Sequence, residues 1–217
     1  MILNQLCDNN AKIKYLGGTM EILYQDQNII VCIKPIGIDS EKQMVEILKE
    51  EVGGMIYPLH RLDLNVGGVM VYARNKTTAA NLSKAIQNKA MIKEYVALVH
   101  GTPPENGVWE DYLWKDSRRN KVYVVKSLRK GAKDAKLEFQ RLRVGEESLV
   151  HIRLHTGRSH QIRVQFASRG FPLVGDHKYG SRSKLKAPQL YSCKISFPYQ
   201  GKTVRYENYP DWTKEKE

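Results

Sequence analysis

Residues 60–74 read HRLDLNVGGVMVYAR, and this stretch decides how the rest of the chain is interpreted. It places Arg61 and Asp63 just before a double glycine and a β-branched run at residues 66–73. Such a run predicts a strand that leads into the core. In extended backbone, residues two apart point to the same side, so we expect the guanidinium of Arg61 and the carboxylate of Asp63 to lie on one side of the segment.

Two interpretations of Asp63 follow from this arrangement. A nearby guanidinium favours the ionised carboxylate, so Asp63 can serve as a nucleophile at neutral pH. The alternative is a structural Arg–Asp pair at a turn, and the tetrapeptide alone favours it because ion pairs are common and nucleophiles are rare.

The segments on either side predict short strands and helices. Residues 21–34 form two β-rich runs around a Gln-Asp-Gln-Asn turn, and residues 92–99 form another strand. Residues 41–52 predict a helix. A second helix is expected over residues 79–89, with Thr77 or Thr78 as its cap.

The second half of the chain continues this pattern. Residues 136–155 predict a hairpin that turns at residues 145–147, and residues 189–206 predict strands around Gln200-Gly201. Residues 159–168 favour a short helix. Since strands dominate and no GxGxxG or GxxxxGK[ST] loop occurs, we expect an α+β fold: one domain with a mixed, largely antiparallel β-sheet flanked by a few helices and loops. Residues 1–19 are polar and predict an irregular arm, with the domain at residues 20–217.

The charge of the chain indicates a polyanionic partner. The 217 residues carry a formal net charge of +12 and a pI near 9.5. The excess is local: residues 115–143 contain eleven basic and three acidic residues, and residues 178–205 contain seven basic residues and no acidic ones. Clustered cations displace counterions from a phosphate backbone. A solvated charged face is the alternative.

Cysteine usage and hydropathy exclude several classes of protein. Cys7, Cys32 and Cys193 are odd in number and far apart, so neither a disulfide framework nor a CxxC metal site is expected. The apolar runs are shorter than a membrane span, and the N-terminus has no signal-peptide pattern. Reduced thiols in a cytoplasmic protein fit these features.

Two further stretches concentrate polar residues. Residues 154–163 read LHTGRSHQIR and predict a strand, a glycine turn and a helix that Ser159 caps. Arg158 and Arg163 can hold a phosphate or a carboxylate there, or they can be surface arginines on an ordinary capped helix. Residues 170–180 read GFPLVGDHKYG and predict a rigid loop in which Asp176 caps or braces a turn.

Taken in order, these motifs closely resemble the RluA family of RNA pseudouridine synthases. The HRLD segment matches that family's signature. The other matching segments are residues 22–26 and 31–37 (KPxG turn), 93–101 (lysine-x-tyrosine strand), 156–163 (TGRxHQIR) and 170–180 (GD-x-x-YG loop). Ordered motifs over roughly residues 20–205 make the resemblance specific, which one motif alone would not.

The chain departs from the family pattern at two places. Val66-Gly67-Gly68 stands where members usually have Thr-Ser-Gly, and Leu190-Tyr191-Ser192 stands where they usually have Leu-His-Ala. These departures leave the substrate preference open. No S4-type RNA-binding domain fits before residue 20, so recognition is expected to rest on the catalytic domain.

The resemblance implies an isomerase that turns uridine into pseudouridine without a metal or an organic cofactor. Asp63 would be the catalytic nucleophile or base. Tyr95 would stack on the target uracil, Leu154 would form an apolar wall beneath it, and Arg163 would pair with Asp63. Arg61 would brace the Asp63 segment or contact RNA. A core tyrosine at position 95 and a structural ion pair at Arg61 remain alternatives.

The implied partner is RNA, ribosomal or transfer, bound by a bacterial, cytoplasmic and monomeric enzyme that contacts neither a membrane nor a metal. The expected phosphate contacts are Lys115, Arg118, Arg119, Lys121, Arg158 and Lys178. One alternative is a non-catalytic RNA-binding or ribosome-associated protein. Another is a hydrolase, although no HExxH pair occurs among the six histidines.

Overall fold

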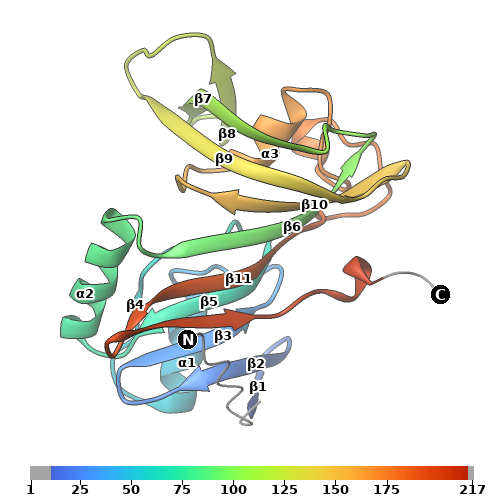
Figure 1. Ribbon diagram of the computed structural model, residues 1–217. Coiled ribbons are helices and arrows are strands. Elements are labelled where there is room, and N and C mark those ends of the chain that lie inside the picture. The colour runs from blue at the N-terminus through green and yellow to red at the C-terminus, as the bar shows by residue number, and fades with distance from the viewer. Residues whose placement is uncertain (1–10, 215–217) are drawn as a thin grey trace. The chain divides into compact units, whose positions relative to one another are not determined.

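The computed structural model describes residues 11–214, which divide into two compact units. The first unit contains the chain up to Lys93 together with Ser192–Asp211, and the second contains Glu94–Tyr191 and the chain from Trp212 onward. The chain therefore leaves the first unit within β6 (Ile92–His100) and returns within β11 (Leu190–Tyr199), as Figure 1 allows the reader to follow.

A twisted set of strands forms the first unit, in the order β1-β2-β3-β5-β11, with β4 beside β5 and β12 beside β11. The strands are β1 (Ala11–Tyr15), β2 (Gly18–Gln25), β3 (Ile29–Lys34), β4 (Tyr57–Pro58), β5 (Gly67–Ala73) and β12 (Lys202–Glu207). The pairings of β1 with β2, β2 with β3, β3 with β5 and β11 with β12 are antiparallel. All seven residues of β5 are buried, so this strand is central to the unit.

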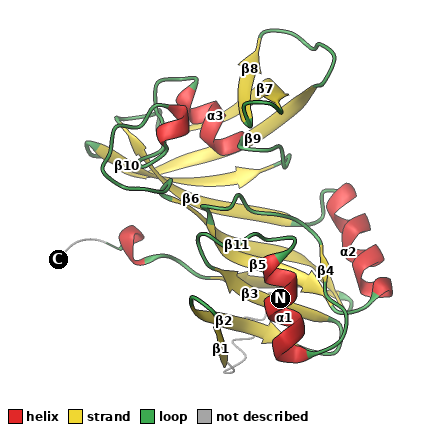
Figure 2. Ribbon diagram, turned by 180° about the vertical axis from the view of Figure 1, so that it is seen from behind, coloured by secondary structure: helices red, strands yellow, loops and turns green. Residues whose placement is uncertain are grey.

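Two helices, α1 (Gln43–Val52) and α2 (Lys76–Gln87), belong to the first unit (Figure 2). Leu82 of α2 packs in one cluster with Val69 and Val71 of β5. Tyr72 points to the other face because side chains alternate along a strand, and its hydroxyl donates to the Ser40 carbonyl just before α1. Both faces of β5 are thereby covered.

The second unit has its strands in the order β6-β10-β9-β7-β8. Its other elements are β7 (Asn106–Asp116), β8 (Lys121–Val125), β9 (Ala132–Arg143), β10 (Glu147–Leu154), α3 (Gln161–Ala167) and the 3-10 turn η1 (His177–Tyr179). A second 3-10 turn, η2, covers Asp211–Thr213. Trp109, Phe139 and Phe166 join β7, β9 and α3, with ring centroids 4.3 to 5.4 Å apart. These aromatic contacts seat α3 on the strands.

The expected α+β class with a mixed, largely antiparallel sheet is confirmed. The predicted strands around residues 21–34 and 189–206 are present as β2, β3, β11 and β12, and the predicted hairpin over 136–155 is present as β9 and β10. A parallel bridge joins Gly101 to Glu147. The three predicted helices are α1, α2 and α3.

Two local expectations are wrong, and two strands were not anticipated. Residues 11–19 are not an irregular arm, because β1 and the start of β2 pair there; residues 1–10 lie outside the described part. Helix α2 begins earlier than expected and is capped by Asn75, whose side chain accepts the Thr78 N–H. The strands β7 and β8 over residues 106–125 were not anticipated, because most of their residues are exposed or half-buried and several in β7 are charged.

Within residues 11–214, no helix is long and apolar enough to span a membrane.

Candidate active site

Asp63 lies on the loop between β4 and β5 of the first unit, with its side chain partly exposed. The carbonyls on both sides of it are held by hydrogen bonds. Ser40 donates its hydroxyl to the Leu62 carbonyl at 3.2 Å, and Gly37 donates its backbone N–H to the Leu64 carbonyl at 2.8 Å. Hydrogen bonds within the protein therefore hold the backbone on both sides of Asp63.

Lys34, at the end of β3, adds a buried cation beneath this loop. Its side chain is fully buried, and its ammonium donates to backbone carbonyls at 2.7, 2.7 and 3.3 Å, those of Pro35, Ile38 and Leu64. Burial lowers the pKa of Lys34 to about 8, although the charges of Asp39 and Asp63 act in the opposite direction. The Lys34 ammonium thus places a buried positive charge beneath the Asp63 loop.

His60, the first residue of the HRLD segment, supports the loop as a neutral ring. Its Nε2 accepts the Val71 N–H at 3.3 Å, and its Nδ1 is buried and has no hydrogen-bond partner among residues 11–214. Burial, together with the charge of Lys93, lowers the pKa of His60 to about 3. Burial also lowers the pKa of Lys93.

Gly68 keeps the glycine of the family's Thr-Ser-Gly segment, and its surroundings give the reason. Its φ is +126°, and a Cβ built on it would lie 2.3 Å from the carbonyl oxygen of Ser192. Ser192 in turn donates its hydroxyl to the Val69 carbonyl at 3.1 Å. Strand β5 therefore approaches β11 so closely after the Asp63 loop that only glycine fits at position 68.

The TGRSHQIR segment in the second unit is organised by Gln161 rather than by a capping serine. The amide of Gln161 accepts from the Thr156 hydroxyl at 2.8 Å and from the Arg158 N–H at 3.0 Å, and it donates to the Lys136 carbonyl at 3.1 Å. The expectation that Ser159 caps the helix is wrong, because the N-cap of α3 is His160 with φ +50°.

Arg163 of α3 is held by a buried carboxylate. Its Nε and one terminal nitrogen donate to the two oxygens of Asp176 at 2.7 and 2.8 Å, and both side chains are at least nine-tenths buried. The expected capping by Asp176 is wrong: its side chain makes no cap hydrogen bond and braces Arg163 instead. A bidentate pair of this kind sets the plane of the guanidinium.

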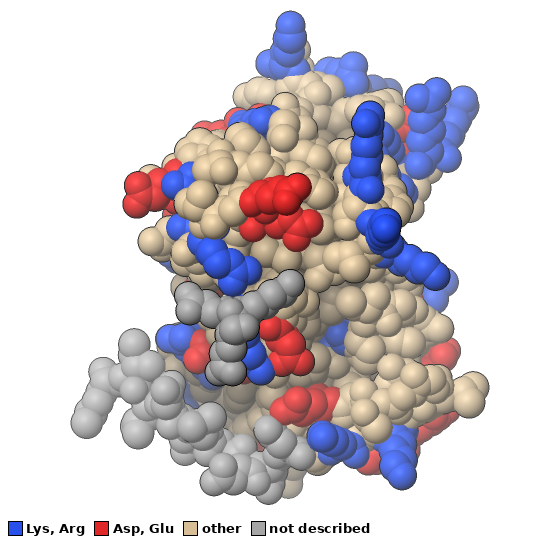
Figure 3. All heavy atoms as spheres, turned by 90° about the vertical axis from the view of Figure 1, so that its right-hand side faces the viewer, with Lys and Arg blue, Asp and Glu red and all other residues tan. Residues whose placement is uncertain are grey.

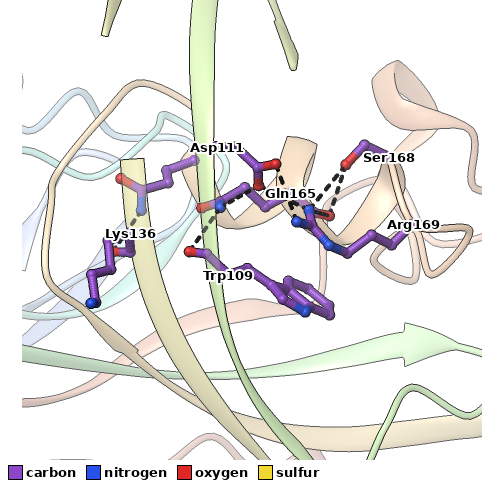
Figure 4. Close-up of polar contacts among 7 residues, drawn as sticks. Trp109, Asp111, Lys136, Gln165, Ser168 and Arg169 are labelled. Carbon is purple, nitrogen blue, oxygen red and sulfur yellow. Dashed lines mark hydrogen bonds and ion pairs between the residues drawn. The ribbon is translucent and has the colours of Figure 1, made fainter. Parts of the chain in front are cut away.

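The C-terminal half of α3 is anchored to β7, as Figure 4 shows. Arg169 reaches both oxygens of Asp111 at 2.9 and 3.1 Å and lies over the Trp109 ring. Gln165 donates to the same carboxylate at 2.7 Å. Since both ends of the helix are tied down, Arg163 projects from a rigid element.

Tyr95 and Leu154 lie on β6 and β10, which are neighbours in the strand order. Tyr95 is 6% exposed, so most of its ring is packed. Leu154 shares its strand face with Val150 and Ile152 and lies opposite Leu137 of β9.

The six predicted phosphate-binding cations differ in their contacts. Lys115, Arg118 and Arg119 are exposed at the β7–β8 hairpin, where the Asp116 carboxylate accepts two backbone N–H groups of the turn and lies 3.8 Å from the Arg119 guanidinium. The remaining three also have partners within the protein: Lys121 the rings of Tyr123 and Tyr179, Lys178 the Asn120 carbonyl, and Arg158 the Asp134 carboxylate. Several Lys and Arg side chains project from the face seen in Figure 3.

The predicted residues thus fall into two groups. Arg61 and Asp63 belong to the first unit, and Tyr95, Leu154 and Arg163 belong to the second. The pairing of Asp63 with Arg163 stays a prediction, as does each residue's contact with RNA.

Sequence reasoning missed Lys34, Gln161 and Tyr179 as organising residues. The sequence did contain a signal for Lys34, because it is the single charged residue at the end of the apolar strand β3. Gln161 and Tyr179 each stood inside a quoted motif, but only their partners far along the chain reveal what they hold.

Among residues 11–214, no three His, Cys, Asp or Glu side chains are grouped so that they could hold a metal ion. The described cysteines, Cys32 and Cys193, are buried thiols that are not joined in a disulfide.

Comparison with solved structures defines the class of fold. The human RNA pseudouridylate synthase domain containing 1 aligns with a TM-score of 0.77 and 22% identity over 88% of this chain and 83% of that one. The human RNA pseudouridylate synthase domain containing 4 aligns with a TM-score of 0.74 and 24% identity over 88% and 89%. The chain therefore has the pseudouridine synthase fold.

Sequence comparison defines the family. Residues 28–168 match the RNA pseudouridylate synthase family. The dual-specificity RNA pseudouridine synthase RluA of Escherichia coli (strain K12) is 31% identical over 204 residues, which cover 86% of this chain and 91% of the relative. The chain belongs to the RluA family of RNA pseudouridine synthases.

Other relatives are longer than this chain. An uncharacterized RNA pseudouridine synthase of Aquifex aeolicus (strain VF5) is 34% identical over 192 residues, which cover 80% of this chain and 60% of the relative. The match to one from Chloroflexus aurantiacus covers 42% of that protein.

Proposed function

We propose that this protein is an RNA pseudouridine synthase that isomerises specific uridines in structured RNA. The observation that carries the proposal is the Asp63 loop. The carbonyls before and after Asp63 are held by Ser40, Gly37 and the buried Lys34, while the Asp63 carboxylate itself is partly exposed. A carboxylate presented on a pre-set backbone, in a chain of this family, suits a reacting group.

The reaction breaks the N1–C1′ bond of uridine and joins C5 to C1′, and the C5 proton leaves to water. Asp63 acts as nucleophile or base: it attacks C1′, abstracts a ribose proton or adds to the ring. The buried Lys34 holds the Leu64 carbonyl next to Asp63, so it supports the backbone that presents the carboxylate in each of these routes.

The second unit supplies the proposed contacts with the target nucleotide. Tyr95 stacks on the uracil once the base has left its stack, and Leu154 lies beneath it as an apolar wall. Arg163, held in plane by Asp176, pairs with Asp63. Arg61, which is exposed, braces the Asp63 segment or contacts the RNA backbone.

Phosphate contacts are proposed for the cations of the β7–β8 hairpin and its surroundings. The residues are Lys115, Arg118, Arg119, Lys121, Arg158 and Lys178. Of these, Lys115 and Arg118 are exposed and suited to counterion release, whereas Arg119, Lys178 and Arg158 must exchange or share a contact within the protein. Lys121 must likewise share its contacts with the Tyr123 and Tyr179 rings.

Transfer or ribosomal RNA is the proposed substrate class. One relative is named a tRNA pseudouridine(32) synthase, mitochondrial, from Saccharomyces cerevisiae, and another a ribosomal large subunit pseudouridine synthase C, from Buchnera aphidicola. We further propose a cytoplasmic enzyme that works as a monomer and needs neither metal nor cofactor. Although residues 11–19 pair at the edge of the strand order, we propose that residues 1–19 are dispensable for catalysis and that residues 20–217 carry the catalytic domain.

Pseudouridine mapping of total RNA tests the activity and finds the substrate together. Cells that lack the gene are compared with cells that carry the wild type, Asp63→Asn or, as a matched control, Glu50→Gln, which changes an exposed carboxylate on α1. We expect a site that is lost on deletion and restored by the wild type and Glu50→Gln only. Rescue by Asp63→Asn, or the absence of any missing site, would instead support a non-catalytic RNA-binding protein.

A further inference from the structure

Tyr179 stands where the basic β7–β8 hairpin meets helix α3. It is the last residue of η1 and follows Asp176 by three positions. Its half-buried ring packs against a small core cluster that contains Val122 of β8 and Val164 of α3. The ring therefore touches both the proposed RNA-binding hairpin and the helix that carries Arg163.

On the hairpin side, η1 holds the edge strand β8. The backbone N–H of Val122 donates to the Tyr179 hydroxyl at 2.9 Å, and the Lys121 ammonium lies 5.5 Å from the ring centroid. The neighbouring Lys178 donates to the Asn120 carbonyl at 3.0 Å, at the turn of the hairpin. Two consecutive residues of η1 thus set the position of the hairpin turn.

On the helix side, the same hydroxyl lies 2.9 Å from Nδ1 of His160. His160 is the N-cap of α3 and has the left-handed φ of +50°, a conformation that costs energy for a non-glycine residue and persists where its surroundings enforce it. The Arg163 guanidinium carbon lies 5.2 Å from the Tyr179 ring centroid, on the side chain that also binds Asp176.

We propose that Tyr179 is a positioning residue that couples RNA binding at the β7–β8 hairpin to the orientation of Arg163. The Tyr179 hydroxyl contacts both the Val122 backbone of the hairpin and the strained His160, and the Tyr179 ring contacts the cations of Lys121 and Arg163. When phosphates draw Lys121 and its strand, the Tyr179 hydroxyl moves with Val122 and carries the first turn of α3 with it. The inference rests on the proposed function, in which Arg163 serves the reacting aspartate.

The test is Tyr179→Phe, which keeps the ring and both cation contacts but removes the hydroxyl. The matched control is Tyr112→Phe, because the Tyr112 hydroxyl on β7 has no hydrogen bond among residues 11–214. The substrate is the RNA in which mapping finds the missing pseudouridine, transcribed with [5-³H]uridine, so that tritium release reports the C5–C1′ bond. Binding of the same RNA is measured separately.

For Tyr179→Phe we expect the single-turnover rate at saturating enzyme to fall roughly tenfold, while the Kd for RNA changes less than about twofold. Tyr112→Phe should behave as the wild type. An unchanged rate, or a loss confined to Kd, would overturn the proposal, since Tyr179 would then serve the hairpin alone.

A readout without catalysis keeps this inference separate from the proposed function. Histidine ring ¹⁵N signals are recorded while a short single-stranded oligouridylate is added, and His160→Gln assigns the His160 signal. We expect the His160 signal to shift in the wild type and to stay in place in Tyr179→Phe. Equal shifts in both proteins would refute the coupling, whereas failure of the proposed function would appear as an inactive wild type whose His160 signal still responds.

Discussion

Replacement of Lys34 by methionine tests whether a buried cation holds the Asp63 loop. Methionine keeps most of the length of the side chain and removes the ammonium that donates to the Pro35, Ile38 and Leu64 carbonyls. Leu64 keeps the Gly37 N–H, so the loss falls mainly on Pro35 and Ile38.

The magnitude follows from two opposing effects. Each hydrogen bond from a charged donor contributes about 1.5–3 kcal/mol. Two such bonds, to Pro35 and Ile38, therefore contribute about 3–6 kcal/mol. Against this, the fall of the Lys34 pKa from 10.5 to about 8 corresponds to about 3.5 kcal/mol for burying the charge, at ~1.4 kcal/mol per pKa unit. The balance predicts that Lys34→Met lowers the free energy of unfolding by about 1 kcal/mol. A shift of the Asp63 carboxylate by ~1 Å would also slow the reaction by about 100-fold.

Urea unfolding at pH 7 and the single-turnover rate of pseudouridine formation measure these two effects. Lys12→Met is the matched control, because Lys12 is exposed on β1 of the same unit. A Lys34→Met protein that matches the control in stability and in rate would refute the reasoning.

The pH dependence of the same comparison has a defined sign. Below pH 8 the folded and unfolded chains both hold the Lys34 proton; between about 8 and 10.5 only the unfolded chain holds it. Wild-type stability relative to Lys34→Met should therefore rise with pH through this window. A flat difference would mean that Lys34 titrates normally.

Two further predictions concern the same unit. Gly68→Ala should lower the free energy of unfolding by about 3 kcal/mol or more, because the added Cβ would meet the Ser192 backbone at a positive φ. Gly170→Ala is the control: its φ is +87° but nothing lies near the added Cβ, so the loss should be about 1 kcal/mol. Equal losses for the two variants in urea unfolding would contradict the close approach of Gly68 to Ser192. The pKa of His60 is lowered to about 3 in the folded protein. As the pH falls from about 6.5 toward 3, His60 is protonated in the unfolded chain but not in the folded one, so the free energy of unfolding should decrease. His60→Gln should flatten that acid limb of the unfolding curve, and an unaltered limb would assign it to other groups.

Much of the fold was readable from the sequence because its signals are local. The β-branched runs, the Gln200-Gly201 turn and the 145–147 turn predicted strands and hairpins that the structure confirms. Strand β7 was not predicted because its residues alternate between exposed and half-buried and several of them are charged, so no apolar run marks it. Strand β1 was missed although Ala11, Ile13 and Tyr15 alternate with two lysines, because five residues are too short a pattern to show that they pair with β2.

By itself, the order of short motifs determined the family and singled out Asp63, because each motif is contiguous and its chemistry needs neighbours in the chain. The tertiary structure alone decided what holds those residues. Lys34 meets the Asp63 loop 30 residues away, Asp176 takes Arg163 in a bidentate pair rather than capping its own turn, and the Val122 N–H finds Tyr179 57 residues on. Burial, close backbone approach and shared hydrogen bonds depend on which residues are neighbours in space, and local sequence patterns do not show those neighbours.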